Sequence, residues 1–119
     1  MEIKFMSSAS RRCYVKDFIG KQAESDQKQI FSDLKLVAEY GYTASINAGM
    51  LKSLKGDKLK KYKIHELIIK TANASFRILC IFRNSVCYLL HAFKKGSDGT
   101  PANELSVAFG RASYLVSIL

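Results

Sequence analysis

The sequence predicts an α+β fold in which helices pack against a small antiparallel sheet. Residues 62–94 contain three strand-length runs rich in Ile, Leu, Phe and Tyr, joined by short connections. Two helical segments precede these runs, and a third follows them. The expected order is strand, helix, helix, three-stranded meander and C-terminal helix. A chain of 119 residues is long enough for one ordinary core, so we expect a single domain over residues 1–119.

The first three elements follow from hydrophobic periodicity. Residues 2–6 (EIKFM) alternate apolar and polar side chains, which indicates a strand. Residues 11–22 (RRCYVKDFIGKQ) predict a first helix, and residues 26–41 (DQKQIFSDLKLVAEYG) predict a second. In the second helix, Ile30, Leu34 and Val37 recur at helical spacing, and Gly41 suits the position after a helix end. Residues 42–61, with two glycines and a lysine cluster, are expected to form a connector.

The second half of the chain is predicted to form a meander and a last helix. The strand-length runs are 62–70 (YKIHELIIK), 75–83 (SFRILCIFR) and 86–94 (VCYLLHAFK). Residues 71–74 and the pair Asn84-Ser85 separate them, and such short connections favour antiparallel pairing. Thr100 is expected to cap a helix that has Pro101 at its first position and Glu104 in its first turn.

These two turns determine an expected strand register. With Asn84-Ser85 as a two-residue turn and 71–74 as a four-residue loop, the opposed pairs are Arg77 with Ala92, Ser75 with Lys94, Ile68 with Arg77, and Glu66 with Leu79. Glu66, Arg77 and Lys94 then share one face of the sheet, and the other face carries His65, His91 and Phe93. Two cations beside a carboxylate suit phosphate chemistry, in which cations stabilise charge and the carboxylate transfers a proton. The alternative interpretation of the three charged residues is that they are solvated surface charges. The alternative interpretation of His91 is a packed or hydrogen-bonded strand histidine.

The positive charge is concentrated in the middle of the chain. The net charge is +9, and residues 50–95 hold 11 of the 19 basic residues but only 2 of the 10 acidic ones. A concentrated basic segment indicates a polyanionic partner, most often nucleic acid. No basic amphipathic helix with exposed aromatic residues supports a membrane surface as the partner.

The three cysteines, Cys13, Cys80 and Cys87, show neither zinc-ligand spacing nor an even disulfide count. We therefore expect free thiols in a reducing compartment, with no metal and no cofactor. The N-terminal residues lack the apolar region of a signal peptide, and no apolar run is long enough to span a bilayer. These observations predict a cytoplasmic protein without membrane attachment.

Several motifs together resemble the RelE/ParE toxin superfamily, in particular its HigB-like, phage-derived branch. They are Leu54 and Gly56, His65-Glu66-Leu67, Phe76-Arg77-Ile78-Leu79, Leu90-His91-Ala92-Phe93-Lys94-Lys95, and Thr100-Pro101. They extend over nearly the whole chain, and the ending from His91 to Pro101 is the most specific part.

The resemblance implies a RelE-like fold and the toxin of a type II toxin–antitoxin module. Many such toxins cut mRNA in the ribosomal A site by attack of a 2′-hydroxyl on the adjacent phosphate. By position, Arg77 corresponds to the phosphate-stabilising arginine, and the other catalytic candidates are Glu66, His91, Lys94 and Lys95. The implied partners are the ribosome, mRNA and an antitoxin with a helix-turn-helix DNA-binding domain that covers the basic face. The lysines expected to hold ribosomal RNA phosphates are Lys52, Lys55, Lys58, Lys60, Lys61 and Lys63.

The sequence departs from the family pattern at three places. Ile68 replaces an arginine, Cys80 replaces an aromatic residue, and no tyrosine lies near the start of the last helix. Two alternatives to the nuclease therefore stay open within this fold: a gyrase-inhibiting member, and a degenerate module that only binds antitoxin and nucleic acid. An unrelated basic RNA-binding domain is a third alternative.

Overall fold

A computed structural model describes residues 1–56, 60–96 and 100–119. The elements are β1 (Glu2–Phe5), α1 (Tyr14–Gly20), α2 (Glu24–Asn47), β2 (Leu51–Ser53), β3 (His65–Lys70), β4 (Ser75–Arg83), β5 (Val86–Lys94) and α4 (Ala102–Ile118). The predicted α+β class is confirmed, and the three strands of the meander lie within the predicted runs.

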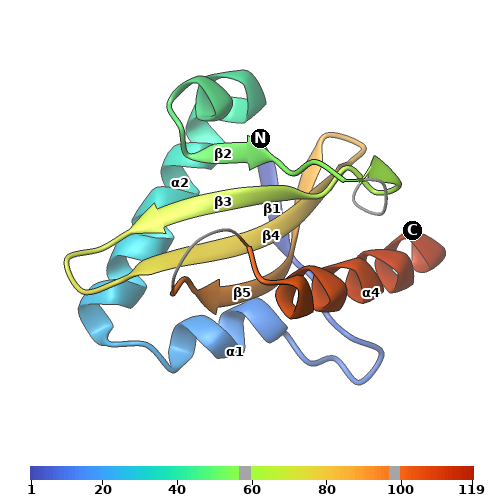
Figure 1. Ribbon diagram of the computed structural model, residues 1–119, viewed down its shortest axis with the longest axis horizontal. Helices are drawn as coiled ribbons and strands as arrows, with labels where there is room; N and C mark the ends of the chain where they lie inside the picture. The colour runs from blue at the N-terminus through green and yellow to red at the C-terminus, as the bar shows by residue number, and fades with distance from the viewer. Residues whose placement is uncertain (57–59, 97–99) are drawn as a thin grey trace.

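The five strands form one sheet in the order β1-β5-β4-β3-β2 (Figure 1). The pairs β2–β3, β3–β4 and β4–β5 are antiparallel, but β1 runs parallel to β5. The parallel edge is possible because α1 and α2 carry the chain from β1 across the sheet to β2 at its far edge. The expectation of a purely antiparallel sheet is therefore wrong at this edge.

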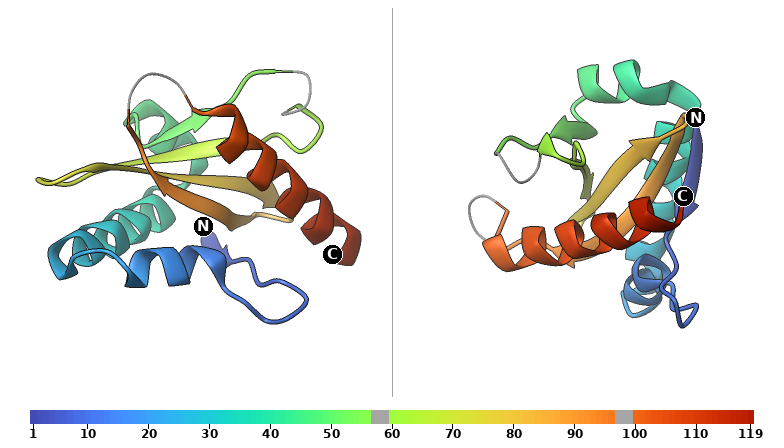
Figure 2. Two further views of the ribbon diagram at one scale, coloured as in Figure 1. Left: turned by 60° about the horizontal axis from the view of Figure 1, so that its bottom comes forward. Right: turned by 90° about the vertical axis from the view of Figure 1, so that its right-hand side faces the viewer.

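Helices cover both faces of the sheet, and Figure 2 shows it between the α1–α2 layer and α4. The helices α1 and α2 share one face of the sheet, and α4 covers the other because β4 and β5 are apolar on both faces. The core under α1 and α2 contains Val15, Ile19, Ile30, Leu34, Leu67, Ile69, Phe76, Ile78, Cys80 and Leu89. The core under α4 contains Leu79, Ile81, Leu90, Phe93, Ala108, Ala112 and Leu115.

The segment expected to be a connector, residues 42–61, contains regular structure. Gly41 has a φ of +81°, as its predicted place after a helix end requires, but helical structure resumes beyond this kink and runs to Asn47. The chain then enters β2, which was not expected because a strand of three residues carries almost no periodic signal.

The last helix begins differently from the expectation. Pro101 occupies the N-cap position of α4, and its side chain makes no capping hydrogen bond. The Thr100 hydroxyl instead donates a hydrogen bond of 2.6 Å to Glu66 Oε2. Thr100 thus joins the segment just before α4 to the beginning of β3, and this contact is part of the candidate site.

Candidate functional site

A β-bulge in β5 determines which side chains share the α4 face. Asn84 and Ser85 both have positive φ, as a two-residue turn with φ > 0 at both central residues requires, and the predicted pairing holds from Arg83 and Val86 to Cys80 and Leu89. Beyond that point the register shifts by one, and Leu90 is the extra residue. The opposed pairs become Leu79 with His91, Ile78 with Ala92, Arg77 with Phe93, and Phe76 with Lys94.

This shift corrects the predicted distribution of side chains. Opposed residues of a sheet point to the same face, so His91 and Phe93 lie on the face that carries Glu66 and Arg77. Lys94 moves to the other face, where its Nζ lies 6.0 Å from the centre of the Phe76 ring. The predicted register between β3 and β4, which places Ile68 opposite Arg77, is confirmed.

A buried ion pair forms the centre of the site. Arg77 Nε lies 3.5 Å from Glu66 Oε1, and the two residues are 8% and 3% exposed. Arg77 Nη1 donates hydrogen bonds to Ser75 Oγ (2.6 Å) and to the Phe76 carbonyl (3.2 Å). Arg77 Nε is buried and has no hydrogen-bond partner in the described part of the chain, so its contact with Glu66 is electrostatic. A buried donor without a hydrogen bond costs about 1–3 kcal/mol, so this N–H is a candidate donor to a bound ligand.

Lysines surround this ion pair on the same face. Lys52 is opposite Glu66, and Lys70 is opposite Ser75, whose side chain contacts Arg77. The Lys95 backbone N–H bonds to the Ser75 carbonyl, so strand alternation places Lys95 on this face as well. Lys52 and Lys70 are exposed, and Lys95 is half-buried. We call the three residues Lys52, Lys70 and Lys95 the lysine rim.

A second polar cluster joins β5 to α4. His91 Nε2 lies 3.3 Å from Glu104 Oε1, and His91 Nδ1 lies 3.1 Å from Arg111 Nη1. Arg111 Nη1 also donates to the Leu90 carbonyl at 3.0 Å. The Arg111 guanidinium carbon lies 3.6 Å from the centre of the Tyr14 ring, which holds the side chain by a cation–π contact.

The environment of His91 favours its neutral form. Burial is the main cause that lowers its pKa below the usual value, the positive charge of Arg111 lowers it further, and Glu104 opposes both. The imidazole is therefore neutral at pH 7. It also stacks on Phe93 with ring centres 5.8 Å apart.

The lysines predicted to bind ribosomal RNA lie mainly between β2 and β3. Lys58 lies outside the described residues. Lys52, Lys55, Lys60, Lys61 and Lys63 are all exposed, but only Lys52 belongs to the lysine rim. Their predicted role in RNA binding stays a prediction.

Sequence reasoning missed four members of the two clusters: Lys70, Thr100, Glu104 and Arg111. A signal existed for the last two. Glu104 and Arg111 are seven residues apart and so lie on one face of a helix, in a C-terminal segment that has only one other charged residue. For Lys70, nothing in the sequence indicated a role in the site beyond its place at a strand end. Thr100 was expected to cap the last helix, so its contact with Glu66 was not predicted.

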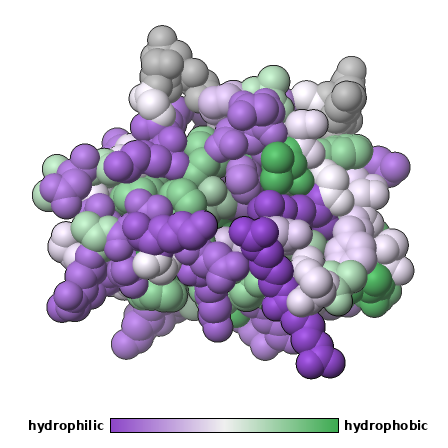
Figure 3. Space-filling model, turned by 90° about the horizontal axis from the view of Figure 1, so that it is seen from below, coloured by the Kyte–Doolittle hydropathy of each residue, from purple (hydrophilic) through white to green (hydrophobic). Residues whose placement is uncertain are grey.

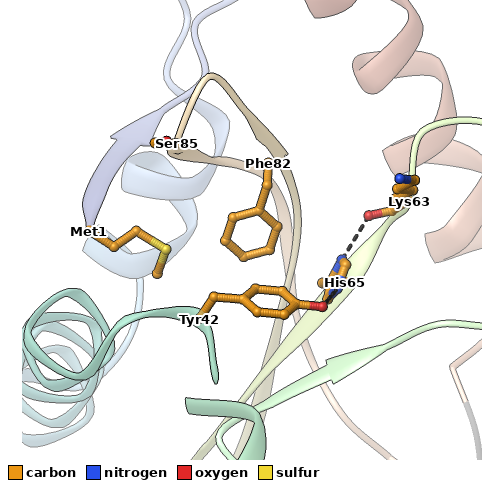
Figure 4. A pocket seen from close by; sticks show the side chains of 6 residues that line it. All are labelled: Met1, Tyr42, Lys63, His65, Phe82 and Ser85. Atoms are coloured by element: carbon orange, nitrogen blue, oxygen red, sulfur yellow. Dashed lines mark hydrogen bonds between the residues drawn. The ribbon is translucent and has the colours of Figure 1, made fainter. Parts of the chain in front are cut away.

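A separate cavity of about 510 Å³ lies on the opposite face of the sheet (Figure 4). Tyr42, His65 and Phe82 meet there edge to face, with ring centres 5.0–5.3 Å apart. His65 Nδ1 lies 2.7 Å from the Lys63 carbonyl and Nε2 lies 2.8 Å from the Tyr42 hydroxyl. His65 is therefore separated from the Glu66–Arg77 pair by the sheet, as its predicted place on the other face requires.

Three further observations concern the surface, the helices and the potential metal ligands of the described residues. On the face seen from below (Figure 3), hydrophilic and apolar side chains are interspersed. Among the described residues, no helix has the length and apolar character needed to cross a bilayer. In the same residues, no three His, Cys, Asp or Glu side chains come together as a metal site would require.

Comparison with known protein families assigns the chain to one family. Residues 17–113 match the model of the family described as phage derived protein Gp49-like (DUF891). No curated protein matches the chain. The matched segment runs from α1 to α4 and contains both polar clusters of the site. The chain therefore belongs to the Gp49-like phage-derived family, within the RelE/HigB-type toxin superfamily.

Proposed function

We propose that this protein is the toxin of a type II toxin–antitoxin module and cuts mRNA on the ribosome. The observation that supports this most is Arg77, a buried guanidinium on a face with three lysines, whose Nε–H makes no hydrogen bond to the described residues. A guanidinium presents fixed donors to phosphate oxygens, and lysines hold neighbouring phosphates as point charges. This combination suits a ribose-phosphate backbone read without base specificity.

In this proposal Arg77 and Lys95 contact the scissile phosphate, and Lys52 and Lys70 hold the phosphates beside it. Glu66 is too buried to exchange protons readily with a substrate. Its carboxylate, held by Thr100, instead fixes the Arg77 guanidinium. Lys94 lies on the other face of the sheet and is left out of the reaction.

The reaction needs a proton acceptor and a proton donor. The 2′-oxygen bonds to phosphorus, the bond from phosphorus to the 5′-oxygen breaks, and the 2′-hydroxyl proton passes to a base. We assign Glu104 as this base, oriented by the His91 Nε2–H, because its carboxylate lies at the start of α4 beside the basic face. Lys95 donates a proton to the leaving 5′-oxygen, and Arg77 stabilises the charge on phosphorus oxygens.

A second candidate is a member of the fold that binds without cutting, and one observation favours it. Ile68 stands directly opposite Arg77, at the position where the family pattern has an arginine. The site therefore has one cation fewer on this face than the pattern provides. In both cases an antitoxin with acidic side chains that covers the lysine rim would neutralise the protein.

Induced expression in a bacterium, followed by primer extension on a reporter mRNA, tests the function. We expect growth arrest and new 5′ ends inside translated codons, and the same mRNA should stay intact in vitro without ribosomes. Growth arrest with intact mRNA and altered DNA supercoiling would instead support a gyrase inhibitor. Normal growth with tight antitoxin binding would support the binding module.

Neutralising the lysine rim should weaken RNA binding in a salt-dependent way. For the variant Lys52→Gln/Lys70→Gln/Lys95→Gln, we expect the slope of log K against log salt for single-stranded RNA to fall by about 2, because each lost phosphate contact removes about 0.7. Fluorescence anisotropy over a salt series measures this slope.

The matched control removes the same charge from the other side of the molecule. Lys28 and Lys35 are exposed on α2, and Lys94 lies on the far face of the sheet. The variant Lys28→Gln/Lys35→Gln/Lys94→Gln should keep most of the salt slope. Equal loss in the two triple variants would show that net charge, and not this face, binds the RNA.

A further inference from the structure

The Leu90 carbonyl in the β5 bulge accepts a hydrogen bond from a side chain outside the sheet. Leu90 is the extra residue, with no partner on β4. A buried carbonyl without a hydrogen bond is costly. Arg111, which belongs to α4, donates a hydrogen bond of 3.0 Å from Nη1 to the Leu90 carbonyl. The bulge is also what places His91 on the Arg77 face, because without the one-residue shift His91 would point to the other side. Arg111 therefore stabilises the backbone shape on which the position of His91 depends.

The same guanidinium group determines where the His91 proton lies. A guanidinium has donors and no acceptor, so His91 Nδ1, at 3.1 Å from Arg111 Nη1, must be the acceptor. A neutral imidazole then carries its proton on Nε2, which faces the Glu104 carboxylate at 3.3 Å. The two contacts agree on one tautomer, since a carboxylate needs a donor and a guanidinium needs an acceptor.

We propose that Arg111 is a positioning residue that holds His91 as the neutral imidazole protonated on Nε2 and, at the same time, holds the bulge that brings His91 to the Arg77 face. Its own side chain is fixed by the Tyr14 ring of α1, so three elements meet at one guanidinium. In this arrangement the Nδ1 lone pair is occupied, and His91 orients Glu104 instead of acting as a general base. Only this last consequence rests on the proposed cleavage reaction.

The charged groups around His91 are consistent with this assignment. Glu104 and Arg111 approach from α4, and Arg77 is its diagonal neighbour on β4. A proton on Nδ1 would point at the Arg111 guanidinium, so the charged imidazolium is disfavoured on that side. Burial lowers the pKa of His91 in the same direction.

The other histidine provides an internal control. His65 Nδ1 faces the Lys63 carbonyl, which only accepts, so Nδ1 must carry the proton. Its Nε2 then accepts from the Tyr42 hydroxyl. The chain has only two histidines, and the structure assigns them opposite tautomers: Nδ1–H for His65 and Nε2–H for His91.

Long-range proton–nitrogen NMR of the labelled full chain at pH 7.5 tests the assignment directly, because the two ring nitrogens of each tautomer have distinct shifts. We expect one histidine of each tautomer, assigned with the variants His65→Gln and His91→Gln. A His91 that is protonated on Nδ1, charged, or an even mixture of tautomers would overturn the proposal. This readout uses the wild-type protein and needs no cleavage activity.

The variant Arg111→Met tests the role of the guanidinium. We expect the His91 signals to move to a mixture of tautomers, its pKa to rise because a nearby positive charge is gone, and the His65 signals to stay unchanged. Arg12→Met is the matched control, since Arg12 also lies over the Tyr14 ring, at 5.3 Å, but the guanidinium bonded to His91 is that of Arg111. His91 signals that are the same in Arg111→Met and in wild type would overturn the proposal.

A cleavage measurement then separates this proposal from the proposed function. If the protein cleaves mRNA, Arg111→Met should lower the rate about 10-fold or more, and Arg12→Met should not. His91→Gln, which retains a side-chain N–H near the position of Nε2, should keep more activity than His91→Ala. Equal loss in both His91 variants would overturn the orienting role of His91. Absence of cleavage in the wild type would reject the proposed function alone, because the tautomers are measured independently.

Discussion

Arg77→Lys should lower the rate of ribosome-dependent mRNA cleavage by about 100-fold or more while the protein stays folded. Removal of one preorganised donor from a charge-stabilising site typically costs this much. Lysine keeps a positive charge beside the Glu66 carboxylate, so this buried group stays paired, but lysine lacks the planar fork that binds two phosphate oxygens. The measurement is the rate of reporter mRNA cleavage on purified ribosomes, with thermal unfolding as the check on folding.

Arg83→Lys is the matched control for this variant. Arg83 lies at the end of the same strand, and its Nη1 bonds to the Phe82 carbonyl at 2.8 Å, away from the Glu66–Arg77 pair. This variant should cleave at nearly the wild-type rate. Cleavage by Arg77→Lys at the wild-type rate would show that the guanidinium of Arg77 is not needed for the reaction. The lysine rim would then be the better candidate for stabilising the phosphate charge.

Glu66→Leu should destabilise the protein by about 3–5 kcal/mol, because it leaves the Arg77 guanidinium buried without its carboxylate. Adding Arg77→Met to this variant should restore the free energy of unfolding to about the wild-type value or above it. An apolar pair of similar volume avoids the cost of desolvating two charges. Urea denaturation of the wild type, the two single variants and the double variant measures the coupling as a double-mutant cycle.

The double variant also separates stability from function. It should be well folded and should not cleave, because the phosphate-binding cation is gone. Glu24→Leu is a suitable surface control, since Glu24 pairs with Lys28 on the exposed side of α2. Loss of this exposed ion pair should change the free energy of unfolding little. A Glu66→Leu variant as stable as the wild type would show that water, and not Glu66, balances the charge of Arg77.

Much of the sheet could be predicted because its determinants are local. Asn84 and Ser85 form a two-residue turn, and residues 71–74 form a short loop, so the pairing next to each turn follows from the number of residues between the strands. This is why the opposition of Ile68 to Arg77 was predicted correctly. Which side chains of β3 and β4 share a face likewise follows from the period-two geometry of a strand.

The place of Lys94 could not be predicted, because it depends on one residue of bulge. A shift by one reverses the face of every later side chain in the strand, and it exchanged Lys94 for His91 and Phe93 on the Arg77 face. Nothing in the run VCYLLHAFK marks Leu90 as the extra residue. The hydrogen bond that the Leu90 carbonyl accepts comes from outside the strand, from Arg111 on α4.

By itself, the sequence determined the α+β class, the meander with its turns, the concentration of positive charge, and the choice of Arg77 and Glu66 as candidate site residues. All of these depend on short-range geometry or on composition. Only the tertiary structure decided that α4 covers the second face, that Thr100 binds Glu66 and is not the N-cap of α4, and that Glu104 and Arg111 meet His91. Those contacts join residues 13 to 34 positions apart in the chain, and local patterns carry no information about such distances.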